Sequence, residues 1–166
     1  MVTKKVVSAG FVVYRKTSKG IKFLLLYRGR GIWDMPRGRM EATERSLQTA
    51  FREVFEETGL KNNELRLQNN FKVFEKFPYS MGKEQIFKIV IFYLAETDKV
   101  QITISDEHEG YGWFTLGEAK KHLAKFKTRA SILKKAWDLV KSKESPAANS
   151  QVVENKPQVS DNKKPL

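Results

Sequence analysis

The 166-residue sequence has no cysteine and no apolar run approaching the ~18 residues that a transmembrane helix requires. The absence of cysteine excludes disulfide bonds, thiolate metal sites and cysteine nucleophiles. The N-terminal segment also lacks an apolar stretch of the length found in secretory signal peptides. These absences favour a protein that contacts no membrane and resides in the cytoplasm.

Composition divides the chain into two parts. Apolar residues make up 40% of the chain and aromatic residues 11%, which is typical of a folded protein. Residues 144–166 differ, because they hold no aromatic side chain but three of the five prolines and many Asn, Ser and Lys residues. Such a composition buries too little apolar surface to form a core. We therefore predict one domain over residues 1–143 and a disordered tail over residues 144–166.

Positive charge is in excess, with 31 Lys and Arg against 19 Asp and Glu and a net charge of +12. Much of the excess falls in residues 118–143, where nine Lys and Arg outnumber Glu118 and Asp138. Such a field attracts polyanions, so it favours a nucleotide, a polyphosphate or a nucleic acid as substrate or partner. A basic surface that binds no ligand is the alternative that charge alone leaves open. None of these features predicts an oligomeric state.

Apolar segments separated by turn residues predict an α/β fold. The expected strands are residues 5–15, 21–28, 64–77, 83–96 and 111–115, and the expected helices are residues 44–58, 116–124 and 128–142. Pro78 and Gly82 favour a connecting loop over residues 78–82, with Tyr79 inside it. Gly59 is expected to end the first helix.

The first helix carries a concentration of negative charge. At about 100° per residue, Glu53, Glu56 and Glu57 lie within one arc of about 100°, opposite the apolar side chains. Like charges at these spacings repel by roughly 0.2–0.5 kcal/mol per pair. A divalent cation would offset all three charges, because Mg²⁺ prefers hard oxygen ligands. A solvated, Glu-rich helix face is the alternative.

The spacing around these acids is informative. Gly38 is followed by five residues and Glu44, and then by seven residues and the segment Arg52-Glu53-Val54-Phe55-Glu56-Glu57-Thr58-Gly59-Leu60. This pattern matches at every position the signature of the Nudix hydrolases, which the chain resembles. The resemblance implies a mixed β-sheet sandwiched between α-helices and a Mg²⁺ cofactor that Mn²⁺ can replace. It implies metal ligands at Gly38, through its carbonyl, and at Glu53, Glu56 and Glu57, whereas Arg52 and Glu44 brace the loop.

Four further segments resemble diadenosine tetraphosphate hydrolases within this family, namely residues 23–26, 33–38, 88–96 and 105–113. The likeness implies that Glu107 approaches the metal from outside the helix, and that Glu53, Glu57 or Glu107 is the general base. It implies a substrate site that contains Arg37, Arg39, Tyr79, Lys88 and Tyr111. Arg39 stands where that branch usually has histidine. The alternatives without a role in binding or catalysis are a solvated edge position for Lys88, packing within its loop for Tyr79 and a place in an acidic turn for Glu107.

The resemblance implies a Mg²⁺-dependent hydrolase of nucleoside polyphosphates, which cleaves diadenosine tetraphosphate to ATP and AMP. An RNA 5′-pyrophosphohydrolase is the nearest alternative, since the basic helices suit an RNA backbone. Hydrolysis of an inositol pyrophosphate is a further alternative. A non-catalytic module that binds a nucleotide or RNA is a different class, which the intact set of three acids argues against.

Overall fold

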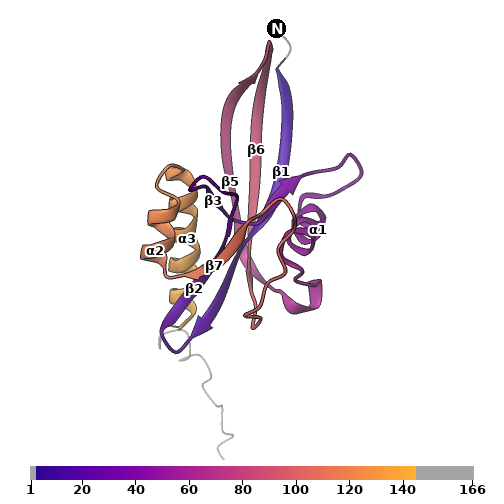
Figure 1. Cartoon of the computed structure of the whole chain (residues 1–166). Helices are drawn as coiled ribbons and strands as arrows, with labels where there is room; N and C mark the ends of the chain where they lie inside the picture. Colours follow the sequence, from indigo (N-terminus) through magenta and orange to yellow (C-terminus); the bar gives the residue numbers. More distant parts are fainter. Residues whose placement is uncertain (1–2, 145–166) are drawn as a thin grey trace, which may run out of the picture.

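A computed structural model describes residues 3–144 of the chain. The strands are β1 (Lys4–Thr17), β2 (Gly20–Tyr27), β3 (Trp33–Asp34), β4 (Arg37–Arg39), β5 (Arg66–Met81), β6 (Glu84–Glu96) and β7 (Gly110–Phe114). The helices are α1 (Ser46–Thr58), the 3₁₀ turn η1 (Asn62–Glu64), α2 (Leu116–His122) and α3 (Lys127–Glu144). Figure 1 shows α1 on one side of the sheet and α2 and α3 on the other.

The sheet is mixed. Its main order is β3-β2-β1-β6-β5, with β4 paired to β1 and β7 paired to β2. Strands β1 and β6 are parallel, and the other pairs are antiparallel. The predicted fold class, a mixed sheet between helices, is therefore confirmed.

Both faces of the central strands are buried, which explains the near-continuous apolar runs of β1 and β2. Alternate residues of β1 point to opposite faces, so Phe11 and Val13 pack in the layer of α1 whereas Val12 and Tyr14 pack in the layer of α2 and α3. Burial of large side chains on both faces supplies the main driving force for folding. The N-terminal end of β1 and the hairpin ends of β5 and β6 extend together beyond both helical layers (Figure 1).

A short segment, residues 33–39, passes from one strand to another. Trp33 and Asp34 pair with β2, and residues 37–39 pair with β1. The step between them passes close to Gly10, where any side chain would meet the carbonyl of Pro36. Strands of two and three residues are too short to show an alternating pattern, so the sequence did not predict β3 or β4.

The predicted loop over residues 78–82 is wrong. Pro78 and Tyr79 belong to β5, where they pair with Phe87 and Ile86, and the turn consists only of Gly82 and Lys83. Because β5 is the outer strand of the sheet, half of its backbone N–H groups need no partner in the sheet, and such a strand tolerates proline. Gly82 has φ +61°, the left-handed conformation that a tight hairpin turn favours.

The two C-terminal helices agree with the predicted positions within two residues. Helix α3 includes Glu144, the first residue of the predicted tail, and the remainder of that tail lies outside the described residues. Within residues 3–144, no helix is both long enough and apolar enough to span a membrane.

Candidate active site

The acids of the first helix lie near its C-terminal end. Helix α1 buries Ala50 and Val54 against the sheet and ends at Gly59, whose φ of +72° provides the left-handed cap. Glu53, Glu56 and Glu57 therefore occupy the last two turns, where the helix dipole is negative and disfavours further negative charge. The position adds to the mutual repulsion of the three carboxylates, so the site attracts cations.

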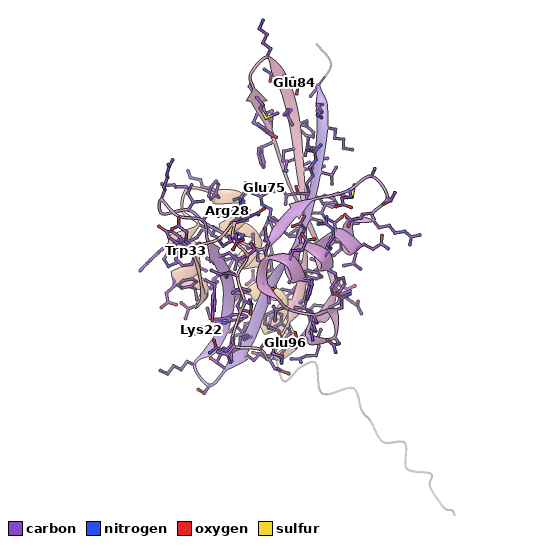
Figure 2. All side chains as sticks on the ribbon, turned by 45° about the vertical axis from the view of Figure 1, so that its right-hand side comes forward. Lys22, Arg28, Trp33, Glu75, Glu84 and Glu96 are labelled. Carbon is purple, nitrogen blue, oxygen red and sulfur yellow. The ribbon has the colours of Figure 1, made fainter. Side chains whose placement is uncertain are left out.

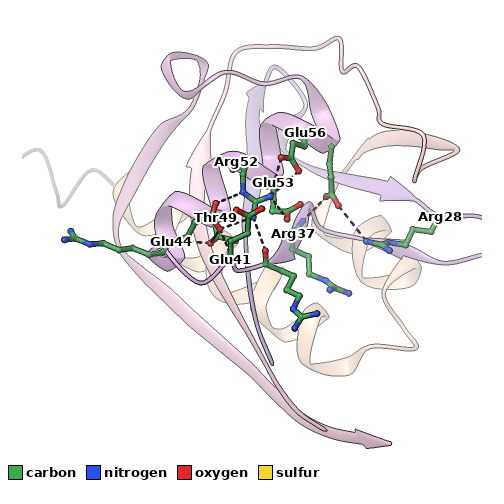
Figure 3. A network of polar contacts seen from close by, with 11 residues as sticks. Arg28, Arg37, Glu41, Glu44, Thr49, Arg52, Glu53 and Glu56 are labelled. Atoms are coloured by element: carbon green, nitrogen blue, oxygen red, sulfur yellow. Dashed lines mark hydrogen bonds and ion pairs between the residues drawn. The ribbon is translucent and has the colours of Figure 1, made fainter. Parts of the chain in front are cut away.

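One arginine holds part of this charge in place. Arg52 contacts the carboxylates of Glu44, Glu53 and Glu56, and its Nη2 donates to the backbone carbonyl of Arg39 at 3.0 Å. Glu44 also accepts hydrogen bonds from the backbone N–H of Glu41 and the hydroxyl of Thr49. Figure 3 shows this network between α1 and the preceding loop. The contacts are those of a brace, as the resemblance implied for Arg52 and Glu44.

Glu57 is the buried member of the acidic group, with 3% of its surface exposed. Its Oε2 accepts a hydrogen bond from the backbone N–H of Arg37 at 3.0 Å, and its Oε1 lies 3.8 Å from Nη2 of Arg28. Burial raises the pKa of Glu57 to about 8, although these two partners oppose the shift and Glu53 adds to it. Ionising this carboxyl group near neutral pH therefore costs substantial free energy when no cation is bound.

Glu53 and Glu107 complete the acidic group. Burial raises the pKa of Glu53, Arg52 opposes this shift, and the charges of Glu56 and Glu107 raise it further. The charge of Glu107, which belongs to the loop before β7, thus acts on the carboxyl group of Glu53 in α1. The carboxyl group of Glu53 lies directly against Gly38, where a side chain would overlap it. Gly38 is needed for this close approach of strand and helix.

A second charged group lies on the other face of residues 37–39. Arg37 and Arg39 pair with Gly10 and Ser8 of β1, so their side chains point to the face opposite Gly38 and α1. Lys88 of β6 lies on the same face. Burial lowers its pKa, and the positive charges of Arg37, Arg39 and Arg129 lower it further. Within residues 3–144, neither Lys88 nor Arg39 forms an ion pair with a carboxylate, so this face retains uncompensated positive charge.

The two predicted tyrosines lie apart. Tyr79 lies on the face of Lys88, with 38% of its surface exposed and its ring centroid 6.3 Å from that of Phe77. Tyr111 pairs with Leu26 and packs in the layer of α1, where its hydroxyl donates to Gln101. The structure therefore brings Tyr79 together with Lys88 and does not bring Tyr111 to them.

Sequence reasoning missed three charged residues of the site. Arg28 approaches Glu57, and Asp34 and Arg129 contact each other behind Arg37. Arg28 follows a strand in a Gly-rich segment, and Arg129 is one of nine Lys and Arg residues between positions 118 and 143, so neither has a distinctive local signal. Asp34 is a different case, because an acid inside an apolar segment is itself a sign of a buried charge pair.

The donor set suits a hard divalent cation. The acidic group offers only oxygen ligands, which Mg²⁺ and Mn²⁺ accept, and it contains a buried carboxylate whose charge is costly. Within residues 3–144, no three His, Asp or Glu side chains already converge on a common point. Such a site needs side-chain adjustment, which agrees with a cation that retains several waters and takes few protein ligands.

Comparison with known proteins identifies the family. The model of the NUDIX domain matches residues 4–135. The chain belongs to the NUDIX family. It is 34% identical over 136 residues to the bis(5′-nucleosyl)-tetraphosphatase [asymmetrical] of Sus scrofa, covering 76% of this chain and 89% of that protein. The Caenorhabditis elegans protein of the same name is 32% identical over 130 residues, covering 77% of this chain and 91% of the relative.

A solved structure agrees with these relatives. The binary complex of the C. elegans Ap4A hydrolase is similar to this chain with a TM-score of 0.72 and 28% identity, over 82% of this chain and 98% of that chain. The predicted resemblance to Nudix hydrolases of the diadenosine tetraphosphate branch is confirmed. So is the predicted enzyme class, a hydrolase that acts on phosphoanhydrides.

Proposed function

We propose that this NUDIX enzyme is a Mg²⁺-dependent hydrolase of dinucleoside tetraphosphates in the cytoplasm and converts diadenosine tetraphosphate to ATP and AMP. The observation that carries the proposal is the presence of two groups of opposite charge on the two sides of β4. The carboxylates gather on the side of α1, and Arg37, Arg39 and Lys88 gather on the other side. A polyphosphate that bridges two nucleosides requires both groups, and the relatives carry the corresponding name.

The acidic group would hold the cation. Glu53, Glu56, Glu57 and the carbonyl of Gly38 are the proposed ligands from α1 and β4, and Glu107 approaches from the loop before β7. When bound, Mg²⁺ or Mn²⁺ neutralises charge on the phosphate oxygens and lowers the pKa of water. The binding of a cation would also remove the cost of ionising the buried Glu57.

The cations of the opposite face would bind phosphate. Arg37 is half-buried and held by Asp34, so its guanidinium is fixed before a ligand arrives. Lys88 and Arg39 have no carboxylate partner within the described residues, and a phosphate would relieve their repulsion. Tyr79 is exposed beside Phe77 on this face, where an adenine ring would stack.

The reaction consists of the attack of water on a phosphorus atom. The oxygen of water forms the new bond to phosphorus, the bridging P–O bond breaks, and the bond electrons leave with the departing nucleotide. The proton of the water passes to a carboxylate. Glu53, Glu57 and Glu107 are the candidates for this base.

One observation favours the RNA 5′ end as a second candidate substrate. A groove of about 580 Å³ runs along β5 and α3, and Lys72, Lys76 and Lys135 line it with no acid among the lining residues. This groove would attract a nucleic acid backbone, and binding there would weaken steeply with salt.

Product analysis tests the two candidates. The enzyme is incubated with Mg²⁺ and either diadenosine tetraphosphate or 5′-triphosphorylated RNA, and the nucleotides are separated by chromatography. Equal amounts of ATP and AMP from the dinucleotide support the proposal. Release of diphosphate from RNA without dinucleotide cleavage would refute it in favour of the second candidate. Glu53→Gln is expected to lower turnover by at least a hundredfold, whereas Asp138→Asn, on the exposed side of α3, leaves it unchanged.

A further inference from the structure

Four charged side chains meet beneath the positive face of the site, and three of them are buried. Asp34, Glu75 and Arg129 expose 2%, 6% and 4% of their surface. They come from β3, β5 and α3, and the fourth member is Arg37 of β4. Figure 2 labels Glu75 at the point where β5 begins to project beyond the helices. A helix near the end of the domain thus contributes a buried charge to the site.

Each charged side chain of the cluster contacts the next, in the order Glu75, Arg129, Asp34 and Arg37. Nε of Arg129 donates to Oε2 of Glu75 at 3.1 Å, and Nη1 of Arg129 lies 3.1 Å from Oδ2 of Asp34. The same Oδ2 of Asp34 accepts a hydrogen bond from Nε of Arg37 and lies close to Nη2 of Arg37, both at 3.1 Å. Oδ1 of Asp34 accepts a hydrogen bond from the backbone N–H of Met35 at 2.8 Å. The guanidinium of Arg129 also lies 4.2 Å from the ring centroid of Phe126. Arg129 is therefore fixed on three sides.

This arrangement distinguishes Arg37 from its neighbours. Two positive and two negative charges balance within the cluster, whereas Arg39 and Lys88 beside it form no ion pair among the described residues. A charge-balanced, hydrogen-bonded cluster holds its members in defined positions, and loss of one buried charge leaves another uncompensated. Arg37 consequently reaches the phosphate face in a fixed orientation, which lowers the entropy lost when a ligand binds.

We propose that Arg129 is a positioning residue, which fixes Asp34 between itself and the backbone of Met35 and so orients Arg37 toward a phosphate of the substrate. The proposal rests on the proposed function, since it takes Arg37 as a phosphate ligand. It also assigns α3 a part in polyanion binding that is independent of the exposed lysines of that helix. Arg129 itself does not contact the substrate.

The experiment is a double-mutant cycle on ligand binding. The probe is inorganic tripolyphosphate, and calorimetry gives its dissociation constant for the wild type, Arg37→Met, Arg129→Met/Glu75→Gln and the combination of all three changes. The second variant removes one charge of each sign, so the cluster stays balanced. It is expected to weaken binding about tenfold, the effect of a lost charge-assisted contact, while adding no further loss to Arg37→Met.

Two results would overturn the proposal. One is unchanged binding by Arg129→Met/Glu75→Gln, and the other is an equal loss in the presence and absence of Arg37→Met, since a general loss of charge or of packing would be additive. Lys127→Met, an exposed change of the same type on α3, is the matched control and is expected to leave the cycle unaffected. If the balanced variant does not fold, Arg129→Lys replaces it in the cycle, because lysine keeps the charge but cannot contact both acids. The probe contains no nucleoside, so failure of diadenosine tetraphosphate cleavage leaves this test intact.

Discussion

The buried carboxyl group of Glu57 is expected to lower the stability of the protein when divalent cations are removed. Its pKa in the folded protein is about 8, against an ordinary value of 4.5. The folded state therefore binds more protons than the unfolded state between these two values, and the free energy of unfolding falls as pH rises through the interval. The favourable effect of the protonated group is complete below pH 4.5 and is lost as pH rises through about 8.

The magnitude follows from the width of this interval. Each pH unit between the two values corresponds to about 1.4 kcal/mol. With 3% of the residue exposed, solvent screens the charge little. At pH 7 the Glu57 carboxyl group is mostly protonated in the folded protein and ionised in the unfolded chain, so the proton taken up on folding costs about 3 kcal/mol. Glu57→Gln removes this cost, because glutamine is neutral and keeps an oxygen for the N–H of Arg37. The exposed partner Arg28 loses an ion pair worth roughly 0–1 kcal/mol.

The assay is urea unfolding followed by circular dichroism between pH 4.5 and 8 in EDTA. Glu57→Gln is expected to be more stable than the wild type by about 2–3 kcal/mol at pH 7, or roughly 5–10 °C in melting temperature. The difference shrinks to less than about 0.5 kcal/mol at pH 4.5. Glu56→Gln is the matched control, because the Glu56 side chain is 54% exposed and its removal relieves little burial. Adding Mg²⁺ is expected to stabilise the wild type more than Glu57→Gln.

A stability difference that stays constant from pH 4.5 to 8 would refute the reasoning, as would a Glu57→Gln variant less stable than the wild type at pH 7. Either result would mean that the carboxylate is well solvated or well paired without a cation.

Three further predictions concern the surroundings of this group. Gly38→Ala is expected to displace the Glu53 carboxyl group and to lower turnover at least a hundredfold, measured as product formation beside a circular dichroism spectrum like that of the wild type. Gly59→Ala places a side chain at φ +72° and 3.2 Å from Cβ of Thr103, which should lower the stability of the fold by about 1 kcal/mol. The melting temperature should therefore fall by a few degrees, while activity at low temperature is retained. Contacts led by Arg52 lower the pKa of Glu44 to about 2, so their stabilisation is present above pH 4.5 and is lost as pH falls toward 2; Glu44→Gln should flatten the acid-unfolding curve in that range.

The sequence predicted the elements whose patterns are long. The three- and four-residue spacing of α1 and the apolar runs of β1, β2 and β6 are local signals, and the structure agrees with them within a few residues. Pro78 misled the prediction of β5, because the position of a strand at the edge of a sheet is a tertiary property that no local pattern records. The strands β3 and β4 were missed because two or three residues carry no period.

The candidate site was predicted in part for the same reason. Glu53, Glu56 and Glu57 share one helix, so their grouping follows from helix geometry alone. Asp34 and Arg129 lie 3.1 Å apart in space but on elements far apart in the sequence, and the charge of Arg129 looks like that of the neighbouring surface lysines. Only the packing of α3 against the sheet separates a buried arginine from exposed ones.

The segment Arg37-Gly38-Arg39 explains how one strand serves two opposite charges. Alternation places both arginines on the face of Lys88 and leaves Gly38 on the face of α1, where the missing side chain gives room to Glu53. The backbone N–H of Arg37 meanwhile donates to Glu57, so a single residue contacts the acidic group through its backbone and carries a cation on its side chain. The separation of the two groups is therefore set by covalent geometry and by the pairing of β4 with β1. A site that joins a cation and a phosphate needs such a fixed separation, because an error of about 1 Å in the placement of reacting groups can cost a hundredfold in rate.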